Sequence, residues 1–491
     1  MKANYCIVIF FLLFCTDCSV SLPKAVMVTT TEQSFWETQP QVEPGAATPS
    51  IDVIVDVNKT AQTIEGFGTC FNELGWTSLS ILNEQDRESI MREMFSPGVG
   101  SNFVLCRMPV AANDFALDWY SYNETDGDFD MQNFSITNDQ KTLIPFIKNA
   151  QKYNSDIKIW ASPWSPPSWM KYNKHYASRS TAAMARRMAN RPRPAGESTY
   201  MFQVVDNGLP EDRQGYEGSD MFIQEEAYLR AYSLYFSKFI DAYKAEGIDI
   251  FAVMPQNEFN SAQIFPSCCW TATGLANFIG NYLGPAMKSK GVEVMFGTME
   301  RANELLVDTI LTNPASGKYI TGVGFQWAGK GAIPGLHKRY PYLKMYQTEQ
   351  ECGNGKNDWK GAVYSWNLMK LFLNNGASGY MYWNTSLMQG GISRWGWAQN
   401  SLVVVNEDKT FRYTPEYYIM KHVSHYVQPE AKKLLSGGAY EDVLAFRNPD
   451  NSIVIIAGNE SEVDIIINID VNGTIYSPQL KAGSISTLYI K

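Results

Sequence analysis

The sequence predicts an α/β protein, a (β/α)8 TIM barrel with an appended β-sandwich domain. Between about residues 63 and 385, eight apolar runs alternate with longer helical stretches, and such alternation indicates parallel strands joined by helices. After residue 435 the chain changes to short strand-like runs separated by turn residues, which is typical of an all-β unit. A length of 491 residues exceeds one compact core and suits a large domain with a smaller one.

The N-terminal 21 residues have the features of an export signal. Lys2 precedes the apolar stretch 7–14, which is too short to span a bilayer, and residues 19–21 (SVS) resemble a cleavage site. Cys15 and Cys18 support a second interpretation, a lipoprotein signal, and the sequence does not decide between the two. We expect an exported protein, periplasmic, extracellular or on the cell surface, that would touch a membrane only through an N-terminal lipid anchor.

The next segments precede the barrel. Residues 22–50 are rich in Thr, Gln, Glu and Pro without periodicity, which predicts a flexible tether. Residues 51–57 alternate apolar and polar side chains, which predicts a half-buried strand. We assign 51–62 as an N-terminal strand that completes the C-terminal β-sandwich (429–491), so that the catalytic barrel (63–428) is inserted between them.

The eight apolar runs give the barrel strands. They are continuous, as expected for strands that are buried on both faces. An open doubly wound sheet is the alternative that this pattern leaves open. The runs are 64–71, 103–110, 157–164, 250–258, 292–299, 320–327, 343–349 and 379–383. Helical stretches between them include 86–95, 143–152, 225–246, 275–290 and 362–374.

Residues 175–220 break this rhythm after the third run. They carry several arginines among small residues and prolines. A connection of this length is usually functional or disordered. It would wall a cleft at the strand ends or form a solvated flap, and the sequence leaves both open.

Composition excludes some classes of function. The net charge of −9 argues against nucleic acid as a partner, because phosphate binding needs a basic face. Eight cysteines, three of them in the signal region, do not make a disulfide framework, and Cys70 and Cys106 are expected to be buried fillers. Only four histidines are present and no His/Cys cluster has metal-ligand spacing, so we expect neither a metal nor another cofactor.

Two glutamates stand where apolar runs stop. Glu258 ends the fourth run and Glu349 the seventh. Active sites of barrels lie at the C-terminal ends of the strands, and two facing carboxylates are what glycoside hydrolysis requires. In the retaining mechanism one carboxyl protonates the leaving oxygen and the other attacks the anomeric carbon. Glu351 is a rival for the second role, because alternation places 349 and 351 on one face.

Aromatic and polar residues gather at the same strand ends. Sugar rings stack on aromatic planes, and pockets of this kind combine aromatics with a few polar groups. Each tryptophan alone is also compatible with a core position. Arg107 and Asp114 are costly to bury unpaired, so they pair with each other or hold a ligand. The candidates for sugar binding are Arg107, Asp114, Trp164, Asn257, Trp327 and Trp383, with Asn384, Gln326 and Gln399 as further polar groups.

At these residues the chain resembles glycoside hydrolase family 30, the group that contains lysosomal glucosylceramidase. The resemblance covers the barrel from about residue 64 to 405. The motifs that carry it are Gly66-Phe67-Gly68, Arg107-Met108-Pro109, the run 161–171 (ASPWSPPSWMK), Asn257-Glu258, Thr348-Glu349 and Tyr382-Trp383-Asn384. It implies that Glu258 is the acid/base and that Glu349, rather than Glu351, is the nucleophile.

The chain also departs from glucosylceramidase. Phe259 follows Glu258 where the family often has proline, and Gln326 and Ala328 flank Trp327 where glucosylceramidase has histidine and tyrosine. The run 391–402 (GISRWGWAQNSL) is similar to the microbial β-1,6-glucanase branch. The resemblance therefore implies a retaining endo-β-1,6-glucanase that acts on a β-linked glucan. The alternatives are a glucosylceramidase, an exo-acting β-glucosidase or β-xylosidase, and a non-catalytic glycan-binding protein.

Overall fold

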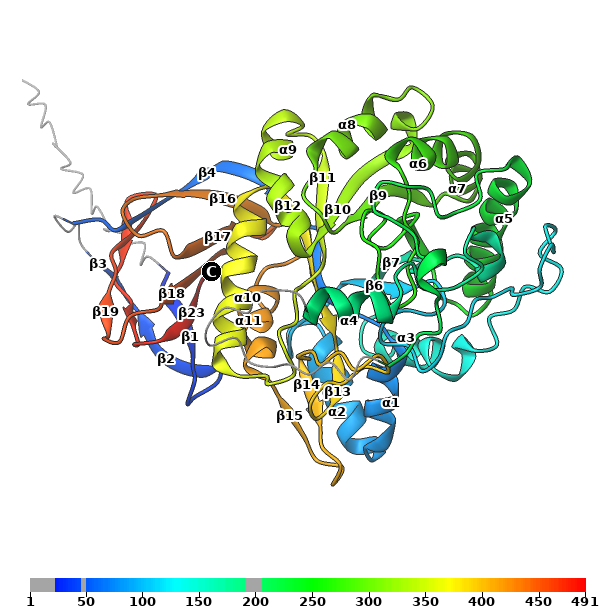
Figure 1. The fold of residues 1–491 in the computed structure, drawn as a ribbon. Helices are drawn as coiled ribbons and strands as arrows, with labels where there is room; N and C mark the ends of the chain where they lie inside the picture. The colour runs from blue at the N-terminus through cyan, green and yellow to red at the C-terminus, as the bar shows by residue number, and fades with distance from the viewer. Residues whose placement is uncertain (1–22, 46–49, 190–204) are drawn as a thin grey trace, which may run out of the picture.

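The computed structural model describes residues 23–45, 50–189 and 205–491. Figure 1 shows two units, a strand barrel surrounded by helices and a β-domain built from both ends of the chain. The predicted signal, residues 1–21, lies outside the described residues. None of the helices in the described ranges is long and apolar enough to cross a membrane.

The predicted barrel is confirmed. Eight parallel strands close in the order β10-β11-β12-β5-β6-β7-β8-β9, and each predicted apolar run contains or overlaps one of them. The strands are β5 (Gly66–Cys70), β6 (Leu105–Pro109), β7 (Lys158–Ser162), β8 (Ile250–Val253), β9 (Glu293–Met299), β10 (Ile320–Gln326), β11 (Lys344–Glu349) and β12 (Ala377–Asn384). A small sheet of β13 (Ser386–Met388), β14 (Val403–Val405) and β15 (Phe411–Tyr413) follows the last strand.

Helices cover the outside of the barrel (Figure 1). Several begin at an Asn, Asp or Thr whose side chain accepts a hydrogen bond from the first turn, for example Asn72, Thr271 and Asp358. The helices are α1 (Glu73–Ile81), α2 (Glu84–Phe95), α3 (Leu143–Gln151), α4 (Thr181–Ala189), α5 (Glu226–Ala245), α6 (Ala272–Phe278), the π-helical η4 (Ile279–Leu283), α7 (Gly284–Lys290), α8 (Glu304–Thr312), α9 (Ile333–Arg339), α10 (Trp359–Asn374) and α11 (Pro415–Ser424).

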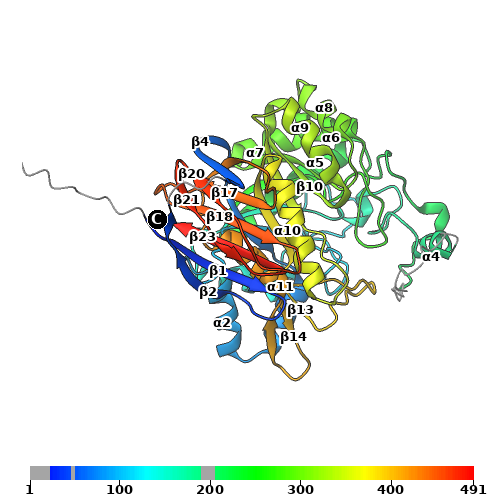
Figure 2. The same ribbon diagram turned by 90° about the vertical axis from the view of Figure 1, so that its left-hand side faces the viewer.

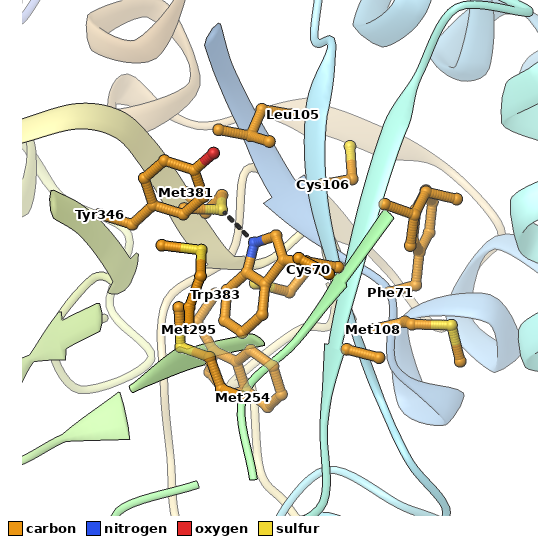
Figure 3. Close-up of a cluster of buried hydrophobic side chains, with 14 of the residues drawn as sticks. Cys70, Phe71, Leu105, Cys106, Met108, Met254, Met295, Tyr346, Met381 and Trp383 are labelled. Carbon is orange, nitrogen blue, oxygen red and sulfur yellow. Dashed lines mark hydrogen bonds between the residues drawn. The ribbon is translucent and has the colours of Figure 1, made fainter. Parts of the chain in front are cut away.

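Large side chains fill the barrel. Figure 3 shows part of this cluster, where Met254, Met295 and Met381 gather near Tyr346. A glycine on β10 makes room for one of them, since a Cβ added at Gly324 would lie 2.6 Å from both Sδ and Cε of Met254. The cysteines of the described residues are free and buried. The packing therefore closes the barrel interior and leaves the strand ends for a site.

The β-domain joins both ends of the chain. Its ten-stranded sheet has the order β2-β1-β23-β18-β17-β16-β4-β20-β21-β3, so the predicted strand at 51–57, which overlaps β4 (Val53–Thr63), does complete it. Strands near opposite ends of this order contribute to one hydrophobic cluster, which indicates that the sheet folds back on itself. The other strands are β16 (Lys432–Gly437), β17 (Val443–Arg447), β18 (Ile453–Asn459), β20 (Ile469–Val471), β21 (Thr474–Tyr476), β23 (Ser484–Ile490) and β3 (Pro44–Gly45), with β19 (Ile465–Ile466) and β22 (Gln479–Leu480) as a separate pair.

The predicted flexible tether at 22–50 is wrong for its described part. β1 (Ala25–Thr31) pairs antiparallel with β23 along its whole length, and β2 (Glu37–Val42) pairs with β1. Threonine favours strands, and here its hydroxyls have partners. Thr29 Oγ1 lies 2.8 Å from Ser486 Oγ, and Thr30 Oγ1 lies 2.8 Å from Nε2 of the buried His422. The Thr-rich composition thus builds a strand.

Helices α10 and α11 lie between the sheet and the barrel (Figures 1 and 2). Trp366 on α10 donates from Nε1 to Asp442 Oδ1 at 2.6 Å, and Lys370 forms an ion pair with the same carboxylate. His422 on α11 contacts β1 and β23 through Thr30 and Thr487. These buried and partly buried polar contacts fix the β-domain against the barrel.

Candidate active site

Glu349 is the last residue of β11 and is only 4% exposed. Arg107 on β6 donates from Nη1 to its Oε2 at 2.8 Å. Trp327, which follows β10, donates from Nε1 to its Oε1 at 3.0 Å. The backbone of Trp327 has φ 47°, a left-handed conformation that is uncommon outside glycine and is held here at a strand end.

Glu258 is placed differently from the prediction. β8 ends at Val253, so Glu258 does not end the strand but lies in a turn beyond it, with φ 49°. The turn is anchored because the Glu258 backbone N–H donates to Thr298 Oγ1 at 2.9 Å and the Asn257 N–H donates to Pro163 O at 2.7 Å. The carboxyl is 4% exposed and accepts from Gln263 Nε2 at 3.0 Å on Oε2.

Gln326 joins the two carboxyl groups. Its Nε2 lies 3.0 Å from Oε1 of Glu258 and 3.2 Å from Oε2 of Glu349. Since both oxygens are bound to one nitrogen, these two oxygens are at most about 6 Å apart, and retaining glycosidases have their carboxyl groups roughly 5–5.5 Å apart. The amide oxygen of Gln326 accepts from Thr348 Oγ1 at 3.1 Å, which orients the amide group.

The two carboxyls have different electrostatic surroundings. Burial raises the pKa of Glu258 well above its ordinary value, and the charges of Glu300 and Glu349 raise it further. Burial also raises the pKa of Glu349, but the Arg107 charge and the Trp327 and Gln326 hydrogen bonds oppose this rise. The pair therefore favours a proton on Glu258 and a negative charge on Glu349.

Arg107 organises this arrangement. Nη2 donates to Asn257 Oδ1 at 2.6 Å and to Ser162 Oγ at 2.9 Å, in addition to the contact with Glu349. Its guanidinium lies over three tryptophan rings, Trp160, Trp164 and Trp383, at 4.9, 4.3 and 5.6 Å from the ring centroids. The residue is fully buried. The predicted pairing of Arg107 with Asp114 is wrong, because the ionic partner of Arg107 is Glu349, and a role in holding a ligand stays a prediction.

The pocket at the strand ends contains part of the predicted set. Asp114, Trp164, Trp327 and both glutamates line it, whereas Arg107, Asn257 and Trp383 lie behind the wall. Trp383 stacks on Trp164 with ring centroids 5.1 Å apart, so it supports a ring that faces the pocket. The complete lining is Asp114, Trp164, Glu258, Gln263, Phe265, Glu300, Trp327, Glu349, Trp397 and Gln399.

Asp114 is 6% exposed, and its Oδ1 has no hydrogen-bond partner among the described residues. Burial and the nearby Glu349 raise the pKa of this carboxyl well above its usual range. A buried acceptor without a partner is costly unless a ligand satisfies it. Asp114 is thus available to a hydroxyl group of a molecule in the pocket.

Three lining residues lie outside both the predicted candidates and the run 391–402, which contains Trp397: Gln263, Phe265 and Glu300. Glu300 directly follows the apolar run 292–299, so the strand-end signal that pointed to Glu349 was present there too. Gln263 and Phe265 carry no such signal, because they reach the pocket only through the loop after Glu258. The rival Glu351 lies outside the lining, where Lys330 and Tyr364 bind its carboxylate.

Comparison with known proteins agrees with this fold and site. The model of the glycosyl hydrolase family 30 TIM-barrel domain matches residues 64–187 and 212–427, and that of the family's β-sandwich domain matches residues 436–488. The chain belongs to glycosyl hydrolase family 30 and is a glycosidase.

Its relatives differ in their named activities. A putative glucosylceramidase 1 of Caenorhabditis elegans is 28% identical over 441 residues, covering 84% of this chain and 77% of the relative. The endo-1,6-β-D-glucanase neg1 of Aspergillus fumigatus is 25% identical over 452 residues, covering 87% and 84%. Among solved structures, SrfJ from Salmonella typhimurium superposes with a TM-score of 0.81 at 21% identity, covering 95% of this chain and 99% of that one. The last likeness concerns the fold alone.

Proposed function

We propose that this protein is a retaining endo-β-1,6-glucanase. Glu349 attacks the anomeric carbon and forms a glycosyl-enzyme, while Glu258 protonates the departing oxygen. Glu258 then removes a proton from the water that attacks the same carbon, which releases the sugar and restores both groups. Asp114 and Trp164 bind the sugar before the cleaved bond. Asn257 and Trp383 do not line the pocket and support the residues that do.

One observation carries the mechanism, the Gln326 amide bonded to both carboxyls. It keeps one oxygen of each group within about 6 Å of the other, which is compatible with the roughly 5–5.5 Å carboxyl separation of retaining glycosidases. The unequal surroundings supply the second requirement, an acid and a nucleophile in one pocket.

The preference for β-1,6-glucan rests on two further points. The run 391–402, which resembles the β-1,6-glucanase branch, supplies Trp397 and Gln399 to the pocket. In addition, the lining next to Glu258 includes Gln263 and the carboxyl of Glu300, which suit a hydroxylated leaving group better than a lipid. The second candidate is a glucosylceramidase or an exo-acting β-glucosidase or β-xylosidase, favoured by the equal similarity to named glucosylceramidases.

The product profile from a linear β-1,6-glucan tests this function. A ladder of β-1,6-linked oligosaccharides supports endo cleavage, whereas release of glucose alone supports the exo-acting alternative. No product from this glucan, with turnover of glucosylceramide, overturns the glucan assignment but keeps the mechanism.

Two glutamate variants serve as a matched pair in the same assay. Glu349→Gln abolishes turnover without loss of folding. Glu351→Gln keeps turnover, because Glu351 lies two residues beyond the end of the same strand and outside the pocket. Equal loss in both variants contradicts the assignment of the nucleophile.

Export is also part of the proposal, on the evidence of residues 1–21. Mass spectrometry of the mature N-terminus from the natural host tests it. Cleavage after residue 21, or a lipid on Cys15 or Cys18, supports export, and an intact Met1 contradicts it.

A further inference from the structure

A third carboxyl group, that of Glu300, stands in the pocket beside the catalytic pair. Glu300 directly follows β9 and is 7% exposed. Its backbone N–H donates to Asn260 Oδ1 at 3.1 Å, and Arg301 Nη1 donates to its Oε1 at 2.7 Å. The other oxygen, Oε2, is buried and has no hydrogen-bond partner among the described residues. Arg301 therefore fixes Oε1, whereas the hydrogen-bonding capacity of Oε2 is not used by Arg301 or Asn260.

Glu300 lies on the Glu258 side of the pocket. Its backbone N–H donates to Asn260, which belongs to the turn that carries Glu258, and the Glu258 N–H donates to Thr298, two residues before Glu300. An acid protonates the leaving oxygen, so the groups beside it face the leaving half of the substrate. Glu300 is therefore expected on the leaving-group side of the bond that breaks.

The charge on Glu300 is supported locally. Burial raises the pKa of its carboxyl, and the Arg301 charge and a hydrogen bond from the Ser261 hydroxyl oppose that rise. Arg301 in turn contacts Glu217 at 3.4 Å, so the ion pair belongs to a chain that reaches the surface. Of the neighbouring carboxyls of Glu258 and Glu300, Glu258 holds the proton and Glu300 carries the negative charge.

We propose that Glu300 is a specificity-determining residue whose free Oε2 accepts a hydrogen bond from a hydroxyl group of the departing sugar. This role of Glu300 rests on the proposed function and adds how the leaving group is recognised. A sugar unit supplies the donor, and an alkyl leaving group does not. A site built around such an acceptor discriminates strongly against molecules that lack the donor, because the buried oxygen is then left unpaired.

The test must separate this role from an indirect effect on Glu258. Removing the Glu300 charge also makes Glu258 more acidic, which affects every substrate that needs protonation. Gentiotetraose and methyl β-gentiobioside provide the comparison. Both present gentiobiose before the bond and both have poor leaving groups that need Glu258, but only the first has a hydroxylated sugar after the bond.

The experiment measures pH-independent kcat/KM for both substrates with wild type, Glu300→Gln and Glu300→Ala. We expect gentiotetraose hydrolysis to fall about 10- to 100-fold, as for loss of a hydrogen bond to a charged group, and methyl gentiobioside hydrolysis to change less than about threefold. Glu217→Gln is the matched control. It removes the same charge from the same ion chain outside the pocket, and we expect it to behave as wild type.

The outcomes are distinguishable. An equal loss on both substrates in the two Glu300 variants overturns the proposal, because Glu300 then acts only through Glu258. Unchanged gentiotetraose hydrolysis overturns it as well. Failure of the wild type to cleave gentiotetraose refutes the glucan assignment itself.

Discussion

Replacing Arg107 by methionine should uncouple the charge of Glu349 from its only described ionic partner. The pair is buried on both sides, with Nη1 and Oε2 2.8 Å apart. Removing one member of a buried ion pair typically costs about 3–5 kcal/mol, because the other charge stays buried without compensation. Trp327 and Gln326 still donate to Glu349, so we expect the lower part of that range, about 3 kcal/mol of unfolding free energy at pH 7.

The sign of the pH dependence follows from the same pair. Without Arg107 the pKa of Glu349 in the folded state rises further above the unfolded value. The variant's deficit is therefore largest at neutral pH and shrinks as acidification protonates Glu349. The acidic limb of kcat/KM, which reports ionisation of Glu349, moves to higher pH for the same reason.

Urea unfolding at pH 7 and pH 5, with pH–rate profiles on one substrate, measures both effects. Arg107→Lys is the control, since it keeps the charge but cannot hold Glu349, Asn257 and Ser162 together. We expect it to lose rate with a smaller displacement of the acidic limb. A stability loss of Arg107→Met that is the same at both pH values, with an unmoved limb, refutes the reasoning.

Three further predictions follow from buried contacts. In the pH profile of wild-type kcat/KM on alkyl glycosides, the basic limb should lie well above the ordinary pKa of a glutamate, because burial holds the proton on Glu258. A basic limb near pH 4.5 would contradict this. Trp327→Phe removes the donor to Glu349 Oε1 but keeps an aromatic ring, so kcat/KM should fall about tenfold or more. An unchanged rate would show that the hydrogen bond to Glu349 is dispensable. Burial lowers the pKa of His422 to about 3. Protonation of this group should therefore lower the wild-type free energy of unfolding by about 4 kcal/mol between pH 6.5 and pH 3. In urea titrations, the His422→Gln variant should lack that part of the acid sensitivity.

Much of the fold could be predicted because barrel strands are buried on both faces and read as continuous apolar runs. All eight runs became strands for that reason. The N-terminal strand β1 could not be recognised in the same way. Its partner β23 lies more than 450 residues away along the chain, and its threonines gave a composition typical of linkers.

The site was predictable where a side chain stands on a strand. Glu349 is the last residue of β11, as expected. Glu258 was correctly included in the pocket but wrongly placed on its strand, because the turn at 257–260 depends on contacts with Thr298 and Pro163. Gln263 could not have been found, since its approach to Glu258 depends on how the following loop folds back.

The most direct test of the catalytic pair is trapping with a 2-deoxy-2-fluoro-β-glycosyl donor that carries a good leaving group, followed by peptide mass spectrometry. The fluorine slows hydrolysis of the glycosyl-enzyme, so the labelled residue is the nucleophile. A single adduct on the peptide that contains Glu349, located to Glu349 rather than Glu351 by fragmentation, is the predicted result. An adduct on Glu258 or Glu351, or turnover with inversion and no adduct, would contradict the account.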